Sequence, residues 1–141
     1  MTQGEAGDAS GPPQYLFVYG TLMSASDHPM ARMLAAAADR LGEASCAGWL
    51  YLVEDYPGLV DAEDSHEVVF GELFRLRDAS VLSELDAYEG CGPGDPQPTL
   101  YVRELRHARL PDGTPVEAWV YRYNRPVSGL RRIVSGRFPA S

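Results

Sequence analysis

The stretch YLFVYGTLM, residues 15–23, places an apolar run directly before a glycine turn. Residues 15–19 are all apolar or aromatic, which is typical of a strand buried on both faces. Gly20, Thr21 and Leu22 then end the strand. The turn has two interpretations. It is either an ordinary tight turn, or a concavity of backbone N–H groups that binds a carboxylate or an oxyanion.

The composition describes an ordinary globular domain and argues against several kinds of partner. The chain has 141 residues, 45% hydrophobic and 23% charged, and no apolar run approaches the ~20 residues of a membrane-spanning helix. The net charge of −8 argues against a nucleic-acid or membrane partner, and a chain without lysine excludes Schiff-base chemistry. Two cysteines and an N-terminus unlike a secretory signal predict a cytoplasmic location. The histidines His28, His66 and His107 lack metal-ligand spacing, so we expect ordinary surface or core residues.

Local patterns predict a disordered leader followed by one domain. Residues 1–14 are rich in glycine, alanine and polar residues, and the domain is expected over residues 15–138. Helices are predicted over residues 29–40 and 78–90, with Asp78 as cap and Gly90 as stop. Strands are predicted over residues 15–19, 43–55, 67–76, 100–110 and 116–123, with a short extended piece in 56–60. Glycines inside two of the strands, Gly48 and Gly71, predict a strongly bent sheet, such as a small barrel.

Glu89 is the candidate for acid–base chemistry. Val81, Leu85 and Glu89 are spaced four residues apart, so Glu89 ends an apolar helix face. Desolvation and the helix dipole both disfavour the ionised carboxylate and raise its pKa, as suits a general acid or base. The alternative is a solvated last turn with Glu89 pointing outward. Asp86 lies off that face, so we expect it to have a surface role.

Six segments, in this order, resemble the gamma-glutamylcyclotransferase-like proteins, and most closely their AIG2-like and gamma-glutamylamine cyclotransferase branch. The segments are VYGTLM, YPGLV, VFGELF, LDAYEG, YVRELR and AWVYRY. The resemblance runs from about residue 15 to the segment IVSGRF, and VYGTL and LDAYEG are its most specific parts. It implies a compact, single-domain α+β fold with a mixed, barrel-like sheet and two main helices.

The resemblance also implies an enzyme that acts on a small-molecule γ-glutamyl compound and needs no metal or cofactor. In this family the α-amine of the γ-glutamyl group attacks its own side-chain carbonyl, the ring closes to 5-oxoproline, and an amine or amino acid leaves. Glu89 matches the catalytic glutamate of the family. The substrate-holding loop of the family matches Tyr19, Gly20, Thr21 and Leu22.

Three further positions match the family less specifically. Tyr101 and Tyr121 match pocket residues, although half-buried hairpin tyrosines are an equally good interpretation, and Arg103 matches an arginine that could pair with a carboxylate. The loop over residues 90–98 is longer than in short family members and could cover the pocket. Two alternatives remain open at this point. One is a non-catalytic small-molecule-binding module, and the other is an enzyme that removes a γ-glutamyl group from a metabolite in a biosynthetic pathway.

Overall fold

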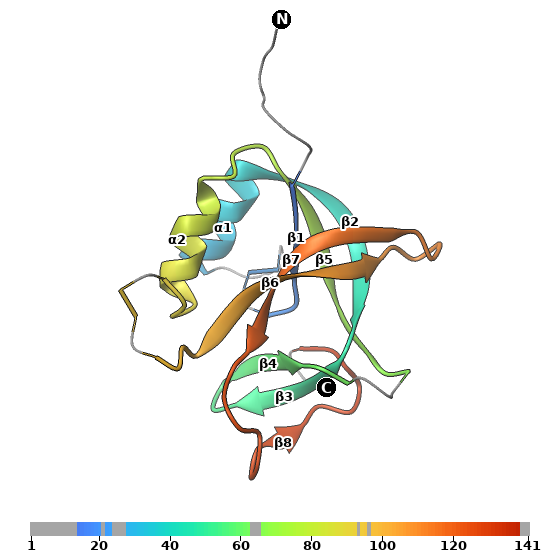
Figure 1. The fold of residues 1–141 in the computed structure, drawn as a ribbon. Helices are drawn as coiled ribbons and strands as arrows, with labels where there is room; N and C mark the ends of the chain where they lie inside the picture. Colours follow the sequence, from blue (N-terminus) through green and yellow to red (C-terminus); the bar gives the residue numbers. More distant parts are fainter. Residues whose placement is uncertain are drawn as a thin grey trace, which may run out of the picture.

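Five strands of the described chain close into a ring, and three further strands extend it on one side (Figure 1). The computed structural model describes residues 14–20, 22–23, 28–62, 66–92, 94–95 and 97–138. In chain order the elements are β1 (Gln14–Val18), α1 (Pro29–Ala37), β2 (Ala38–Ala47), β3 (Trp49–Val53), β4 (Tyr56–Val60), β5 (Val68–Leu76), α2 (Val81–Tyr88), β6 (Tyr101–Arg109), β7 (Pro115–Tyr123) and β8 (Arg131–Arg132). The predicted α+β class with a barrel-like mixed sheet is confirmed.

The ring runs β1–β5–β2–β6–β7 and closes because β1 also pairs with β7. That closing contact is parallel and joins Leu16 to Trp119. β4 also lies parallel to β7, with Leu59 opposite Arg122, and β3 and β8 follow it outward. Since β6 occupies the other edge of β7 along its whole length, β1 and β4 share one edge. The sheet therefore splits where β1 leaves β7 and β4 joins it.

The strand β1 is buried on both faces because its alternate side chains enter two different apolar clusters. Leu16 and Val18 pack with side chains of the two helices. Phe17 packs with residues contributed by all five strands of the ring, which fill the barrel. The helices α1 and α2 lie side by side against one flank of the ring (Figure 1). This double burial explains why the sequence of β1 is apolar at successive positions rather than at alternate ones.

The helix predicted over residues 29–40 is three residues too long at its C-terminal end. It ends at Ala37, and Ala38 already has extended backbone angles (φ −148°, ψ 159°). From Ala38 onward the chain pairs with β5, so sheet pairing overrides the helix propensity of the alanine-rich run. The first strand begins at Gln14, inside the range predicted as leader, while residues 1–13 lie outside the described residues.

Two other local predictions are also corrected. The strand predicted over residues 43–55 is two strands, β2 and β3, which part at Gly48 with φ +154°. A Cβ at Gly48 would lie 2.7 Å from the Val60 carbonyl oxygen, so only glycine fits. Asp78 does not cap α2, because the N-cap residue is Ser80. The Asp78 carboxylate instead accepts hydrogen bonds from the backbone N–H and the hydroxyl of Ser80, in the turn before the helix.

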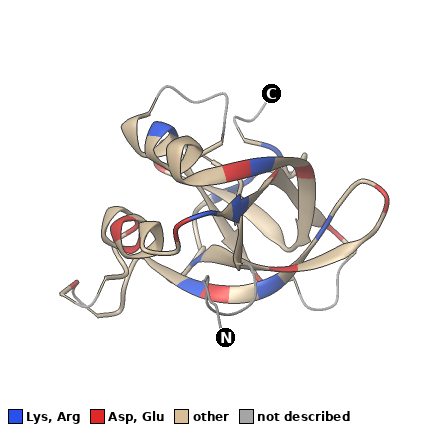
Figure 2. Ribbon diagram, turned by 90° about the horizontal axis from the view of Figure 1, so that it is seen from above, with Lys and Arg blue, Asp and Glu red and all other residues tan. Residues whose placement is uncertain are grey.

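Acidic and basic residues alternate along the strands rather than forming separate patches (Figure 2). Glu104 accepts from Arg106 at 2.6 Å and from Arg122 at 3.0 Å, and Glu67 pairs with Arg132 at 2.5 Å. Two of the arginines near the C-terminus, Arg122 and Arg132, thus pair with carboxylates. None of the described helices is long and apolar enough to cross a membrane.

Candidate active site

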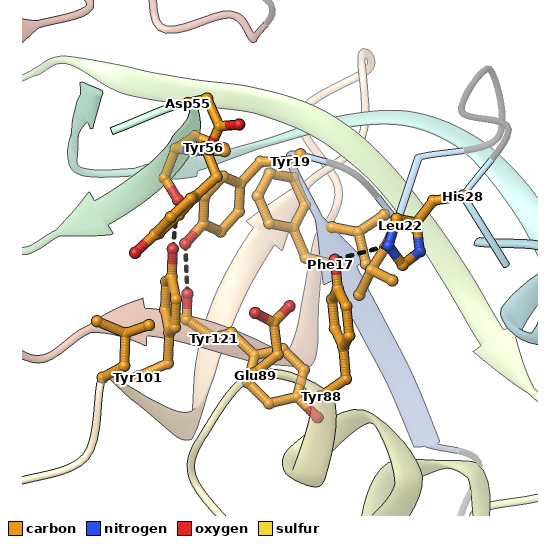
Figure 3. A pocket seen from close by; sticks show the side chains of 14 residues that line it. Phe17, Tyr19, Leu22, His28, Asp55, Tyr56, Tyr88, Glu89, Tyr101 and Tyr121 are labelled. Atoms are coloured by element: carbon orange, nitrogen blue, oxygen red, sulfur yellow. Dashed lines mark hydrogen bonds between the residues drawn. The ribbon is translucent and has the colours of Figure 1, made fainter. Parts of the chain in front are cut away.

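A cavity of about 410 Å³ opens at the split in the sheet, beside the C-terminal end of α2 (Figure 3). That volume suits a small metabolite. Its walls come from the ends of β1, β4, β6, β7 and α2. The lining residues are Phe17, Val18, Tyr19, Gly20, Leu22, His28, Asp55, Tyr56, Pro57, Tyr88, Glu89, Leu100, Tyr101 and Tyr121.

The structure brings the residues predicted for the site together, although they come from four distant segments. Those that line the cavity are Glu89, Tyr19, Gly20, Leu22, Tyr101 and Tyr121. Thr21 lies outside the described residues. The turn after β1 is closed by Met23, whose backbone N–H donates to the Gly20 carbonyl at 3.1 Å. The cavity thus borders on this turn, as both the backbone-cradle interpretation and the family resemblance require.

Glu89 lies at the C-cap of α2, and its carboxylate points into the cavity (Figure 3). The helix stops there because Gly90 adopts φ +75° and donates to the Ala87 carbonyl, while Cys91 donates to the Asp86 carbonyl. The apolar face of α2 holds Leu85 fully buried, and Glu89 at the end of that face is half-buried. This burial raises the pKa of Glu89 to about 7. The direction inferred from the helix pattern is therefore correct, and the carboxylate is poised for proton transfer near neutral pH.

The hydroxyl of Tyr19 bridges the split in the sheet. It donates to the backbone carbonyl of Tyr121 at 2.5 Å and accepts from the backbone N–H of Leu59 at 3.1 Å. These are backbone groups of β7 and β4 at the point where the two strands diverge from β1. One phenol thus satisfies two main-chain groups that the split would otherwise leave unpaired.

Each of the three buried tyrosines of the cavity donates its hydroxyl proton to an acceptor within the protein. Tyr19 donates to a carbonyl as described, Tyr101 donates to the Pro57 carbonyl at 2.6 Å, and Tyr121 donates to Asp86 Oδ1 at 2.7 Å. A phenol has one proton to donate and two lone pairs. The three oxygens can therefore offer the cavity only acceptors, which suit an ammonium or amide N–H and not a carboxylate. Burial raises the pKa of all three, so they stay neutral phenols.

Asp86 is not the surface residue that its helical position suggested. Its carboxylate accepts from Arg103 Nε at 2.7 Å and Nη2 at 3.0 Å, and from the Tyr121 hydroxyl. The pair is largely shielded, with 23% of the Arg103 side chain and 16% of the Asp86 side chain exposed. A step of three residues turns a helix by only about 60° from a full turn, so Asp86 lies beside the apolar face that ends in Glu89. The expectation that Arg103 pairs with a carboxylate is confirmed.

Two residues at the mouth of the cavity, His28 and Tyr88, were not among those predicted for the site. The ring of His28 caps α1, because Nδ1 accepts the backbone N–H of Met30 at 3.1 Å, and its Nε2 lies 3.3 Å from the Tyr88 hydroxyl. It is therefore not an ordinary histidine. Pro29 at the first helical position was a usable signal, since the residue before it is the expected cap.

The turn between β3 and β4 contributes Asp55 and Tyr56, which were also missed. Tyr56 packs against Tyr101, with ring centroids 6.4 Å apart. Within the described part of the chain, no residue hydrogen bonds the Tyr56 hydroxyl. Its proton is therefore not committed to any of the described residues. Of the loop predicted over residues 90–98, no described residue lines the cavity, and Leu100 is the first to do so.

The side chains that line the cavity give it an acidic character. All twelve basic residues of the chain are arginines within the described ranges, and none of them lines the cavity. The ionisable side chains that do are Asp55, Glu89 and His28, besides the tyrosines. An anionic group of a ligand must therefore be held by N–H or O–H donors. Among the described residues, no group of three His, Cys, Asp or Glu side chains could hold a metal ion.

Comparison with known proteins identifies the family. Residues 16–140 match the family described as gamma-glutamyl cyclotransferase, AIG2-like. The gamma-glutamylcyclotransferase family protein YtfP of Citrobacter rodentium is 37% identical over 126 residues, which span 87% of this chain and 93% of the relative. The solution structure of YtfP from Escherichia coli has a TM-score of 0.60 at 33% identity and covers 89% of this chain and 96% of its own. An AIG2-like protein of Mus musculus shares the fold, with a TM-score of 0.66 at 22% identity over 82% of each chain. The chain belongs to the AIG2-like gamma-glutamyl cyclotransferase family.

Proposed function

We propose that the protein is a cyclotransferase that releases 5-oxoproline and a free amine or amino acid from a γ-glutamyl compound. The observation that supports this best is Glu89, a carboxylate whose pKa burial raises to about 7, facing a cavity whose buried phenols offer only acceptors. The reaction begins with an ammonium that must lose a proton before it can attack. A chain-terminal amine has a pKa of roughly 7.7 to 8.0, so a base with a pKa near 7 is well matched to it.

The reaction balances without a co-reactant. Glu89 accepts a proton from the ammonium, and the freed amine attacks the γ-carbonyl carbon of the same glutamyl group. The bond between the new ring nitrogen and that carbon forms, and the bond from the carbon to the leaving nitrogen breaks. Glu89 returns its proton to the leaving nitrogen, which departs as a free amine. The new ring nitrogen releases its surplus proton to water, and the free amine takes up a proton from water to become an ammonium. Since the attack is intramolecular, holding the glutamyl chain folded supplies much of the acceleration.

The hydrogen-bond directions in the cavity support one placement of the two ends of the glutamyl group. The acceptor oxygens of Tyr19, Tyr101 and Tyr121 suit the α-ammonium, close to the base that deprotonates it. The α-carboxylate needs donors, and we assign it to the backbone N–H groups of the turn that follows β1, with the Tyr56 hydroxyl as a further donor for the carboxylate or the carbonyl oxygen. Specificity for the glutamyl half would then reside mainly in this turn and the tyrosines.

The charge of the cavity suggests which leaving groups are accepted. No arginine lines it, and Asp55 adds a carboxylate at its mouth. A second carboxylate on the leaving group would therefore meet like charge without a cation to compensate it. We expect uncharged or cationic amines to leave more readily than acidic amino acids.

The two alternative functions, a binding module and an enzyme of a biosynthetic pathway, make different demands on the site. A non-catalytic binding module has no need of a buried carboxylate with a raised pKa. Removal of a γ-glutamyl group from a biosynthetic metabolite is the same reaction with a particular leaving group, and the acidic cavity favours it when that metabolite is a polyamine-like cation.

The test is mass spectrometry for 5-oxoproline after incubation with three matched compounds. These are γ-glutamyl-ethylamide, γ-glutamyl-1,4-diaminobutane and γ-glutamyl-glutamate, with neutral, cationic and anionic leaving groups. The α-N-acetyl form of each is the control, because a blocked amine cannot close the ring. We expect release from the first two, slower release from the third and none from the controls. A protein inert towards all three would contradict the proposed activity, whereas fastest release from γ-glutamyl-glutamate would contradict the charge argument alone.

A further inference from the structure

The carboxylate of Asp86 ties the last turn of α2 to the hairpin formed by β6 and β7. It receives two hydrogen bonds from Arg103 of β6 and one from the Tyr121 hydroxyl of β7. The guanidinium of Arg103 is itself fixed, because it stacks over the Trp119 ring at 4.3 Å from the centroid. The anchor is thus rigid on the hairpin side, and its far end lies one helical turn before Glu89.

The backbone of Asp86 fixes the same turn from the other side. Its carbonyl accepts the Cys91 N–H at 3.0 Å, across the glycine that ends the helix. The Glu89 N–H donates to the Leu85 carbonyl at 2.8 Å, so Glu89 belongs to the last hydrogen-bonded turn. Side chain and backbone of one residue therefore hold the turn that carries the base.

We propose that Asp86 is a positioning residue, which with Arg103 holds the last turn of α2 against the β6–β7 hairpin and so keeps the Glu89 carboxylate inside the cavity. It also accepts the proton of the Tyr121 hydroxyl, which leaves only lone pairs on that oxygen for a ligand. The consequence for catalysis rests on the proposed function, but the placement of Glu89 does not.

Packing alone does not explain this arrangement. The apolar contacts of Val81, Leu82 and Leu85 already attach α2 to the core. Such contacts are non-directional and tolerate small rotations of the helix end, whereas three hydrogen bonds to one carboxylate do not. A partly buried ion pair also contributes little net stability compared with apolar side chains of the same size. Directional control of the helix end is the property that apolar residues could not supply.

The expected effect on Glu89 follows from its surroundings. The ionisable groups that border the same cavity are Tyr19 just after β1, Asp55 and Tyr56 at the start of β4, Tyr88 of α2, Tyr101 of β6, Tyr121 of β7 and His28 before α1, and Cys91 lies just after the helix. Burial is the cause of the raised pKa of Glu89. If the last turn loosens, water reaches the carboxylate, and its pKa should fall towards the ordinary value of 4.5.

The test is a ¹³C NMR titration of the Glu89 carboxyl carbon in the full chain, with kinetics and thermal melting on the same samples. Asp86→Ala removes the anchor. Asp86→Asn keeps its size but has only one acceptor oxygen, so at least one of the three bonds is lost. Glu84→Ala is the matched control, since Glu84 is an exposed carboxylate on the same helix. We expect the Glu89 pKa to fall in both Asp86 variants and to stay near 7 in the control.

On γ-glutamyl-ethylamide, we expect kcat to fall by about 10- to 100-fold in the Asp86 variants while KM changes by less than about threefold, because a displaced base affects the chemical step. A folded Asp86→Ala protein in which Glu89 still titrates near 7, with kcat as in the wild type, would overturn the inference. If Asp86→Ala does not fold, Asp86→Asn decides on the same two readouts. A wild type that makes no 5-oxoproline would refute the proposed function, and the titration would still decide the role of Asp86.

Discussion

The surroundings of Glu89 disfavour the negatively charged form of its side chain. It ends an apolar helix face, and the structure buries it enough to raise its pKa to about 7. A carboxylate without a function is rarely kept in such a place, since ionising it there costs free energy. The pocket around it has a matching chemistry, because three of its phenols donate their protons to protein acceptors and leave only lone pairs for a ligand.

Replacing Glu89 by glutamine should abolish most turnover without unfolding the protein. Glu89→Gln keeps the size of the side chain but cannot accept a proton, so kcat should fall by roughly two to four orders of magnitude. Glu84→Gln is the control, because it makes the same change at an exposed position of α2. Asp86→Asn cannot serve as that control, since Asp86 anchors the helix end. The measurement is 5-oxoproline release from γ-glutamyl-ethylamide, and near-normal release by folded Glu89→Gln would contradict a general-base role.

The raised pKa of Glu89 predicts opposite pH trends for activity and stability. The proposed general base must be ionised to act, so kcat/KM should rise as pH increases through about 7. The folded state holds the Glu89 proton more tightly than the unfolded state does. Its contribution to stability is therefore complete below pH 4.5 and is lost as pH rises through about 7.

Urea unfolding of the wild type and Glu89→Gln across this range measures the stability effect. We expect the variant to gain on the order of 3 kcal/mol relative to the wild type between pH 4 and pH 8. A constant difference between the two proteins would show that Glu89 titrates alike in the folded and unfolded states.

At the scale of elements, the position of the turn after β1 depends on how closely β5 approaches the end of that strand. Gly71 of β5 lies against Val18, where a Cβ would come within 2.1 Å of the Val18 carbonyl oxygen. The next residues of the chain, Tyr19 and Gly20, line the cavity. The glycine that the sequence marked as an interruption of a strand is thus a close-approach point that places one wall of the site.

Gly71→Ala should weaken both the fold and the site. The added methyl group must push β1 away from β5, which should lower the free energy of unfolding by about 2 kcal/mol or more. Gly94→Ala is the control, because no atom lies within 4 Å of a Cβ there. Thermal melting of the two variants tests the prediction. Equal melting temperatures would show that β1 and β5 can separate at little cost.

At the scale of the whole molecule, the site exists because the sheet splits. The ring and its three-stranded extension share β7, and β1 and β4 meet its edge one after the other. The cavity lies where β1 and β4 diverge, and the Tyr19 hydroxyl bonds to backbone groups of β7 and β4 at that point. Ring and extension are thus joined at the site itself, so the stability of the site and that of the whole sheet should be coupled.

Tyr19→Phe should destabilise the entire protein rather than the cavity alone. The variant leaves the Leu59 N–H and the Tyr121 carbonyl without their partner, at a cost of about 1–3 kcal/mol for each buried group that stays unpaired. Tyr51→Phe is the matched control, since Tyr51 lies on β3, away from the cavity. Urea unfolding followed by fluorescence and by far-UV circular dichroism should show one transition, shifted to lower urea in Tyr19→Phe only. Two separate transitions would show that ring and extension unfold independently.

The sequence by itself determined the features that depend on neighbouring residues. The apolar run of β1, the face of α2 that ends in Glu89, the stop at Gly90 and the family motifs were all readable, because each arises within a few residues of chain. The end of α1 at Ala37 was not readable, since pairing with β5 overrides the helix propensity there.

Only the tertiary structure decided how the cavity works. The hydroxyl of Tyr19 meets a carbonyl 102 residues away, and Arg103 reaches Asp86 across 17 residues, so no local pattern encodes either contact. The same holds for His28 and Tyr56, which join the site because separate elements converge on the split in the sheet. Side-chain type and helical phase are properties of the local chain, whereas burial and hydrogen-bond direction depend on what the fold brings against each side chain.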